Sequence, residues 1–199
     1  MDANTAPLSA VLLCDRHTSD EIAVEPWTAR PEGQRALDHL AARIEPQVDD
    51  VVLVTLNPLA LFRWNGLIAA PNSARPSLLE ALYTGLKLVR HHQVLVTAIK
   101  VPWLQPEVFH LLRAALQPRW DAILPQVAGR SMAFPAFYTK GCLHRIELHL
   151  ERNVTGISAL LEKLRFRPVS EKKLRQADRK LLSFMVLEEE GESGKDDGS

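Results

Sequence analysis

Residues 93–116, QVLVTAIKVPWLQPEVFHLLRAAL, decide the fold class of this chain. The first seven residues (93–99) form an almost continuous apolar run, which is typical of a strand that is covered on both faces of a parallel sheet. Residues 106–116 then carry apolar side chains at helical spacing. The stretch therefore predicts a strand followed by a helix, which is the repeating unit of α/β folds.

The same alternation recurs along the chain. Further apolar runs predict strands at 10–14, 51–56, 67–70 and 121–127, and helical periodicity predicts helices at 33–44 and 78–90. Strands that alternate with helices favour right-handed crossovers. We expect a three-layer α/β/α, Rossmann-like fold with a mostly parallel sheet.

The second half of the chain predicts a different run of elements. We expect a strand, two helices and a closing strand at 134–139, 143–150, 156–164 and 181–187. Residues 1–187 are predicted to form a single domain. The last residues, EEEGESGKDDGS (188–199), are acidic and rich in glycine and serine, so they are predicted to be a disordered tail.

Composition narrows the possible partners. The 199 residues include 24 Lys and Arg and 24 Asp and Glu, so no net charge favours nucleic acid or a membrane surface as a partner. The two cysteines form no CxxC pair and no cluster with histidines, so neither a disulfide framework nor a metal site is expected. The first residues lack a basic segment before a long apolar run, and we expect a cytoplasmic protein.

In open sheets of this kind, ligands bind beyond the carboxyl ends of the strands. Two further stretches bear on what the ligand is. Residues 129–169, GRSMAFPAFYTKGCLHRIELHLERNVTGISALLEKLRFRPV, combine a Gly-Arg pair, an apolar strand, a leucine-bearing helix, a glycine and a paired-leucine helix that runs into a final strand. Together with 93–112 and GQRALDHLAARIEPQVDDVVLV (33–54), this order resembles the MobA-like NTP transferases, which include the molybdenum cofactor guanylyltransferases, over about residues 9–187.

The resemblance implies that the loop after the first strand holds a nucleotide triphosphate, which places Cys14, Asp15 and Arg16 at a nucleotide-binding site. Family members have a glycine-rich loop there that ends in an Arg and a Lys, because backbone N–H groups and cations surround the phosphates. Here residues 14–23 read CDRHTSDEIA, with neither glycine nor lysine. Acidic side chains near a triphosphate repel it.

The resemblance also implies a Mg²⁺ ligand after the strand at 93–99, where the family pattern CDMPFL has an Asp. The corresponding residue is Lys100. An ammonium group does not bind a metal, but it can neutralise part of a phosphate's charge, and we predict this catalytic role for Lys100. A family turn that contains Asn is absent from SFMVLEEE (183–190), and the acceptor loop is altered at SARPSLLEALYTGL (73–86).

Gly129 and Arg130 retain the family's Gly-Arg pair, and the resemblance implies that they bind the acceptor. Each candidate also has a purely structural interpretation. Lys100 can be a solvated lysine at the rim of the sheet, Arg16 can pair with nearby acids, and Asp15 can cap a turn. Gly129 can serve a tight turn, and Cys14 has no flanking base that would make it a nucleophile.

Two hypotheses follow. The first is a divergent guanylyltransferase of molybdenum cofactor biosynthesis that uses GTP and Mg²⁺ on molybdopterin, with lost or altered catalysis. The second is a protein with the same fold that binds a nucleotide, a pterin or a protein of the cofactor pathway without chemistry. No cofactor is certain, and GTP and Mg²⁺ are expected only if the family's activity is retained. Replacement of the glycine loop, the metal-binding Asp and the final Asn together favours a pseudoenzyme.

Overall fold

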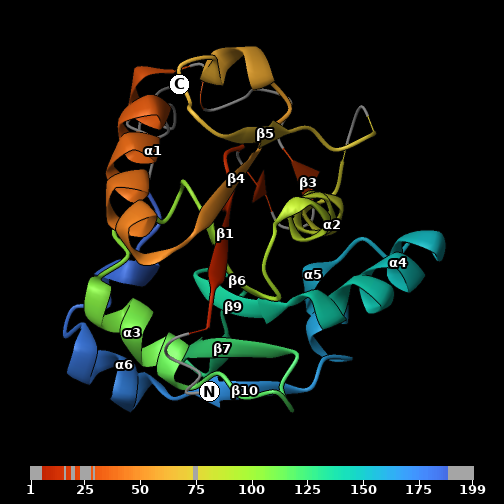
Figure 1. The fold of residues 1–199 in the computed structure, drawn as a ribbon. Helices are drawn as coiled ribbons and strands as arrows, with labels where there is room; N and C mark the ends of the chain where they lie inside the picture. Colours follow the sequence, from red (N-terminus) through yellow and green to blue (C-terminus); the bar gives the residue numbers. More distant parts are fainter. Residues whose placement is uncertain are drawn as a thin grey trace, which may run out of the picture.

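One sheet separates two layers of helices (Figure 1). The helices on one face are α1 (Pro31–Ile44), α3 (Pro106–Ala114) and α6 (Glu171–Ala177), and those on the other face are α2 (Leu78–Leu88), α4 (Leu143–Glu151) and α5 (Ile157–Leu161). This computed structural model describes residues 6–15, 17–18, 21–22, 28, 30–73 and 76–187. The three-layer α/β/α expectation is confirmed.

The sheet has eight strands, in the order β10-β7-β9-β6-β1-β4-β5 with β8 beside β7. The strands are β1 (Leu8–Leu13), β4 (Asp50–Val54), β5 (Leu67–Ala69), β6 (Gln93–Ala98), β7 (Ala122–Val127), β8 (Arg130–Ser131), β9 (Ala136–Thr139) and β10 (Phe166–Val169). β1 lies parallel to β4 on one side and to β6 on the other, while β9 runs antiparallel between β6 and β7. The sheet is mostly parallel, as predicted. A second, two-stranded sheet pairs β2 (His17–Thr18) with β3 (Glu21–Ile22) in the loop after β1.

Local sequence explains where the helices begin. α1 and α3 start with a proline, whose missing N–H is harmless in the first turn. α2 starts after Ser77, whose hydroxyl accepts a hydrogen bond from the Glu80 N–H at 3.1 Å. α2 also packs closely on β1 at Gly85, where an added Cβ would lie 2.4 Å from a methyl group of Val11. Glycine is therefore needed for this close approach.

Two hydrophobic clusters fill the layers on either side of the sheet. One cluster joins α1, α3 and α6 to the sheet through fully buried side chains such as Leu40, Leu112 and Leu174. The other joins α2, α4 and α5 to it through Leu82, Ile146 and Leu160. No helix in the described ranges is long and apolar enough to cross a membrane.

The predicted closing strand at 181–187 is wrong. Leu182–Phe184 forms a 3₁₀ helix, and the last strand is β10, which lies parallel to β7 at the edge of the sheet. The apolar side chains of Leu181 and Phe184 are buried in the cluster that contains α3, which explains their hydrophobic character. The predicted acidic tail at 188–199 lies outside the described residues.

Candidate functional site at the carboxyl edge of the sheet

β1, β4 and β6 end at the same level, so the residues that follow them meet at one edge. The ladder continues one residue past the strands, because Cys14 N–H donates to Val54 at 2.9 Å and Ile99 N–H donates to Leu13 at 3.0 Å. Thr55 continues it on the other side, donating from its N–H to Ala69 at 2.9 Å. We call this region the carboxyl edge. It is where ligands bind in folds of this class.

Asp15 lies at this edge, where it links the residues that follow β1 and β4. Its carboxylate is 2% exposed and accepts hydrogen bonds from the Thr55 hydroxyl at 2.9 Å and from the Leu56 N–H at 2.6 Å. The Thr55 hydroxyl in turn accepts from the Asn57 N–H at 3.1 Å. Burial raises the pKa of the Asp15 carboxyl above its ordinary value, although both hydrogen bonds act to lower it. Each oxygen of Asp15 thus already has a protein donor.

Thr55 was missed as a site residue in the sequence. It is fully buried, and its hydroxyl holds Asp15 while also capping the turn at Asn57. The available signal was weak: Thr55 is the single polar residue within the predicted strand 51–56, whereas Asp15 directly follows the run 10–14.

Cys14 faces the interior of the protein. Its side chain is fully buried, and the thiol donates a hydrogen bond to the Leu12 carbonyl at 3.3 Å. Burial raises the thiol pKa well above its ordinary value, and the neighbouring Asp15 charge acts in the same direction. A protonated, buried thiol does not act as a nucleophile. Arg16 lies outside the described residues.

Lys100 follows β6 in a turn that is closed by a hydrogen bond from the Val101 N–H to the Ala98 carbonyl at 2.9 Å. Its own carbonyl accepts from the Leu187 N–H at 2.8 Å. The structure therefore places Lys100 at the carboxyl edge, as the sequence predicted. It also brings the end of the described chain to the same loop.

Gly129 and Arg130 lie in the hairpin between β7 and β8. Ala128 and Gly129 have φ angles of 50° and 75°, which is the left-handed region required by a tight two-residue hairpin turn. Arg130 is exposed. In the sheet order, β7 lies three positions from β1, or roughly 14 Å at ordinary strand spacing. The structure thus does not bring this pair into contact with Asp15.

The described donors at the carboxyl edge do not fit Mg²⁺. This ion requires about six oxygen ligands in near-octahedral geometry. The carboxylate of Asp15 is buried with both oxygens engaged, and the position after β6 holds the ammonium of Lys100. Within the described ranges, no group of three or more His, Cys, Asp or Glu side chains is arranged to hold a metal.

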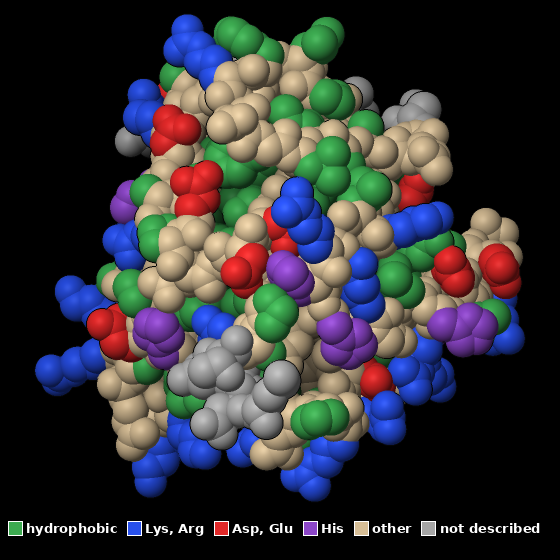
Figure 2. Space-filling model, in the orientation of Figure 1, with side chains coloured by type: hydrophobic (Ala, Val, Ile, Leu, Met, Phe, Trp, Pro, Cys, Tyr) green, Lys and Arg blue, Asp and Glu red, His purple; other side chains and the backbone are tan. Residues whose placement is uncertain are grey.

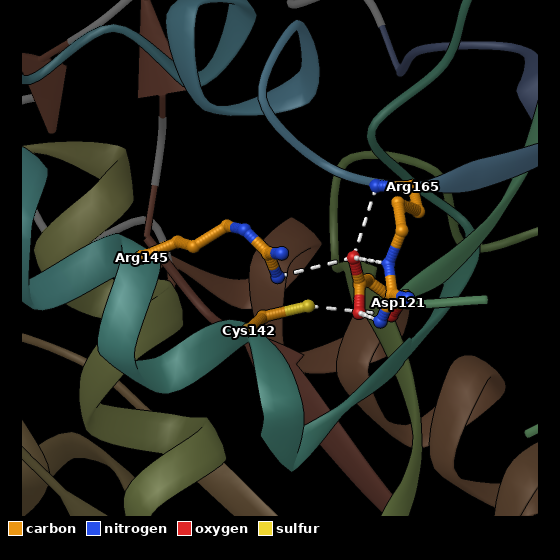
Figure 3. A network of polar contacts seen from close by, with 4 residues as sticks. All are labelled: Asp121, Cys142, Arg145 and Arg165. Atoms are coloured by element: carbon orange, nitrogen blue, oxygen red, sulfur yellow. Dashed lines mark hydrogen bonds and ion pairs between the residues drawn. The ribbon is translucent and has the colours of Figure 1, made fainter. Parts of the chain in front are cut away.

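A second buried aspartate lies at the opposite edge of the sheet, where β7 and β10 begin (Figure 3). Asp121 accepts hydrogen bonds from the Arg165 guanidinium at 3.1 and 3.2 Å, from the Arg165 N–H at 2.9 Å and from the Arg145 guanidinium at 3.1 Å. The Cys142 thiol donates to the Asp121 carbonyl at 3.2 Å. Burial acts to raise the pKa of the Asp121 carboxyl, but Arg165 and Arg145 hold it below its ordinary value.

A cavity of about 590 Å³ lies on the α2 side of the sheet. Ala70 and Asn72, just beyond β5, line one end, and Glu80, Tyr83 and Lys87 of α2 line its wall. The Tyr83 hydroxyl donates to Glu147 of α4, and the Lys87 ammonium lies 5.4 Å from the centre of the Tyr83 ring. The cavity is therefore lined by one cation, one acid and an aromatic ring, of which the acid and the ring belong to the segment 73–86.

Solved structures identify the class of fold. The chain superposes on molybdopterin-guanine dinucleotide biosynthesis protein A from Archaeoglobus fulgidus with a TM-score of 0.71 and 18% identity, covering 90% of this chain and 91% of that one. The molecule therefore has a nucleotidyltransferase-type α/β fold.

The sequence identifies the family. The MobA-like NTP transferase domain matches residues 27–169, so the chain belongs to this family. A molybdenum cofactor guanylyltransferase from Desulfosudis oleivorans is 29% identical over 77% of this chain and 76% of its own length. A probable molybdenum cofactor guanylyltransferase from Natranaerobius thermophilus is 22% identical over 92% of this chain and 91% of its own. The domain match begins beyond β1 and the loop that follows it.

Proposed function

We propose that this chain is a MobA-like protein of molybdenum cofactor biosynthesis that has lost metal-dependent nucleotidyl transfer. Its relatives named molybdenum cofactor guanylyltransferase support the pathway. One observation carries the loss of activity: the carboxylate after β1 is occupied by Thr55 and Leu56. Because Asp15 is also only 2% exposed, little of this carboxylate is accessible to a ligand.

Two further departures from the family pattern, at Lys100 and at residues 14–23, support the same proposal. Lys100 stands where the family's metal-binding Asp is expected, and its ammonium cannot bind a divalent ion. Residues 14–23 contain no glycine that would let backbone N–H groups approach a triphosphate. Transfer to molybdopterin requires stabilisation of the charge that develops on the reacting phosphate. Preorganised cations usually provide this stabilisation.

The direct test measures pyrophosphate release from GTP with molybdopterin and Mg²⁺. We expect no release above the protein-free background. The Lys100→Asp variant is the informative companion, because it restores a carboxylate after β6 but leaves Asp15 engaged and the glycine loop absent. We expect no release from this variant either. Turnover by the unmodified protein would contradict the loss of transfer.

A non-catalytic binding module on the same fold is the second candidate, and the cavity beside α2 favours it. Cavities of several hundred Å³ with a few convergent polar groups are typical of small-molecule sites. Lys87 and Tyr83 suit an anionic, planar ligand such as a nucleotide or a pterin.

A thermal shift assay tests the binding module, because a ligand that binds the native state raises its apparent stability. A binding module predicts that GTP or a pterin raises the Tm equally in Mg²⁺ and in EDTA, and that Lys87→Gln reduces the shift. Lys163→Gln, outside the cavity, is the matched control. A shift that requires Mg²⁺ would instead favour retained metal-dependent binding.

A further inference from the structure

The chain is neutral overall, but its charges are separated along the sequence. Residues 113–180 contain 14 Lys and Arg against 6 Asp and Glu, a net of eight positive charges. Residues 1–112 contain 9 against 12, and residues 188–199 contain one Lys against six acids. Such asymmetry within a neutral chain indicates a local partner of opposite charge.

The positive charge is concentrated on α6 and the turn that follows it. Five exposed side chains form this surface, which we call the basic face: Lys172, Lys173, Arg175, Arg179 and Lys180. In Figure 2, Lys and Arg side chains gather along the lower part of the molecule, where α6 and β10 lie in Figure 1. The opposite side of α6 is buried through Leu174.

Few acids offset the basic face. Arg175 forms an ion pair with Glu171 at 2.7 Å. For the other four side chains, no ion pair with a carboxylate of the described part of the chain is present. Asp178, which directly precedes Arg179 in the sequence, is buried and accepts hydrogen bonds from the Ser183 N–H and hydroxyl at 2.8 and 3.0 Å. Apart from Arg175, the basic face is thus a cationic surface without an acidic partner in the described part of the chain.

The described chain ends within reach of this surface. Asp178 and Ser183 fix the segment that follows α6, and Ser183 also accepts from the Gln105 N–H at 3.0 Å. Leu187 is then held against Lys100 at the carboxyl edge, at which α6 also begins. The twelve residues that follow can span up to about 40 Å when extended. This length exceeds that of α6, which is roughly 10 Å for seven residues.

We propose that residues 188–199 dock on the basic face of the same molecule and act as an intramolecular competitor for other polyanions. The six acids and the five cations are complementary in sign and similar in number. Tethering raises the effective concentration of the segment at the surface, so individually weak ion pairs suffice for docking. The proposal is independent of whether the protein transfers nucleotides.

Zero-length cross-linking of the full chain tests the contact directly. A carbodiimide joins a lysine amine to a carboxylate only where the two touch, and mass spectrometry identifies the pairs. We expect cross-links from Lys172, Lys173 or Lys180 to acids of 188–199 at low salt. In 1 M NaCl, where the Debye length is about 3 Å, we expect their yield to fall several-fold.

Two controls decide the identity of the occupant. An equal mixture of ¹⁴N- and ¹⁵N-labelled protein distinguishes contacts within one chain from contacts between two chains. Mixed-isotope cross-links would overturn the intramolecular proposal in favour of a second copy. Docking on the basic face would be overturned if the acids of 188–199 cross-linked to Lys140 and Lys163 as often as to the lysines of the basic face. It would also be overturned if residues 188–199 formed no cross-link.

Competition provides a second, independent readout with immobilised heparin as the polyanion. We expect a full-length variant with the six tail acids changed to amides to elute at higher NaCl than the unmodified protein. Adding Lys172→Gln and Lys173→Gln should abolish this gain, whereas adding Lys140→Gln and Lys163→Gln should leave most of it. Elution of the amide variant together with the unmodified protein would contradict the proposal.

Discussion

Two buried aspartates close opposite edges of the sheet, and their surroundings differ in one respect. Asp15 at the carboxyl edge is bound by a hydroxyl and a backbone N–H, which carry no net charge. Asp121 at the amino edge is bound by the guanidinium groups of Arg145 and Arg165. Burial raises the pKa of Asp15, where no cation offsets it, whereas the two guanidinium groups lower the pKa of Asp121.

The difference shows how the two edges are specialised. Full charge pairing at Asp121 stabilises the junction of β7, β10 and α4, because a buried charge without a partner is costly. The carboxyl edge is the ligand-binding edge of this fold class. Among the described residues, only neutral groups donate hydrogen bonds to the Asp15 carboxylate there. The Asp15 carboxylate at this edge is thus held by the protein's own groups.

The largest effect is expected from Asp121→Asn. The amide has nearly the same size, but it removes the negative charge and turns two N–H groups towards other donors. Loss of one member of a buried, paired network costs about 3 kcal/mol in the free energy of unfolding. Urea denaturation measures this change. Arg145→Gln is the control for the pair alone, and we expect a cost of about 1 kcal/mol because that side chain is 34% exposed.

A smaller loss is expected from Asp15→Ala. This change leaves the buried Thr55 hydroxyl and the Leu56 N–H without their acceptor, which costs about 2 kcal/mol. Asp15→Asn should cost about 1 kcal/mol or less, since an amide oxygen replaces one acceptor and no charge is buried. The comparison of the edges fails if Asp15→Asn is as damaging as Asp121→Asn.

The next change tests whether the hairpin turn between β7 and β8 requires a glycine at position 129. Gly129→Ala places a Cβ on a residue with φ of 75°, and the strain costs about 1 kcal/mol. No atom lies within 4 Å of that Cβ, so crowding adds nothing. Arg130→Gln should leave stability unchanged, which urea denaturation can check. Equal costs for the two variants would assign Arg130 a structural role as well.

The fold was predictable because most of its elements carry strong periodic signals. The runs 93–99 and 51–56 became β6 and β4, and the helical pattern at 106–116 became α3. Apolar periodicity did not predict β10, because its sequence, FRPV, contains an arginine and a proline that are unlike a buried strand, although the family resemblance implied a final strand after the paired-leucine helix. An edge strand tolerates both, since one side of it forms no ladder.

The site was only partly predictable. The sequence placed Asp15 and Lys100 after β1 and β6, and both lie at the carboxyl edge. The partners of Asp15 could not be predicted, because Thr55 is 40 residues away and only the register of β1 with β4 brings them together. Asp121 gave no signal at all, since its partners Arg145 and Arg165 lie 24 and 44 residues away.

The smallest expected effect, and the sharpest test of the comparison, is the dependence of stability on pH. A carboxyl whose pKa is lowered by folding stabilises the native state above its unfolded pKa, near 3.8, and loses that contribution as the pH falls through its folded pKa. The advantage of the unmodified protein over Asp121→Asn should therefore shrink as the pH falls below about 4.

Asp15 has the opposite sign, because its folded pKa is raised. Its contribution is fully present below the unfolded pKa and is lost as the pH rises through the folded pKa. The stability of Asp15→Asn relative to the unmodified protein should thus improve as the pH rises above about 4, with a slope below about 1.4 kcal/mol per pH unit. Urea denaturation between pH 3 and pH 7 measures both slopes. Parallel profiles for the two variants would contradict the comparison, because burial without a cationic partner at Asp15 and pairing with two guanidinium groups at Asp121 should give slopes of opposite sign.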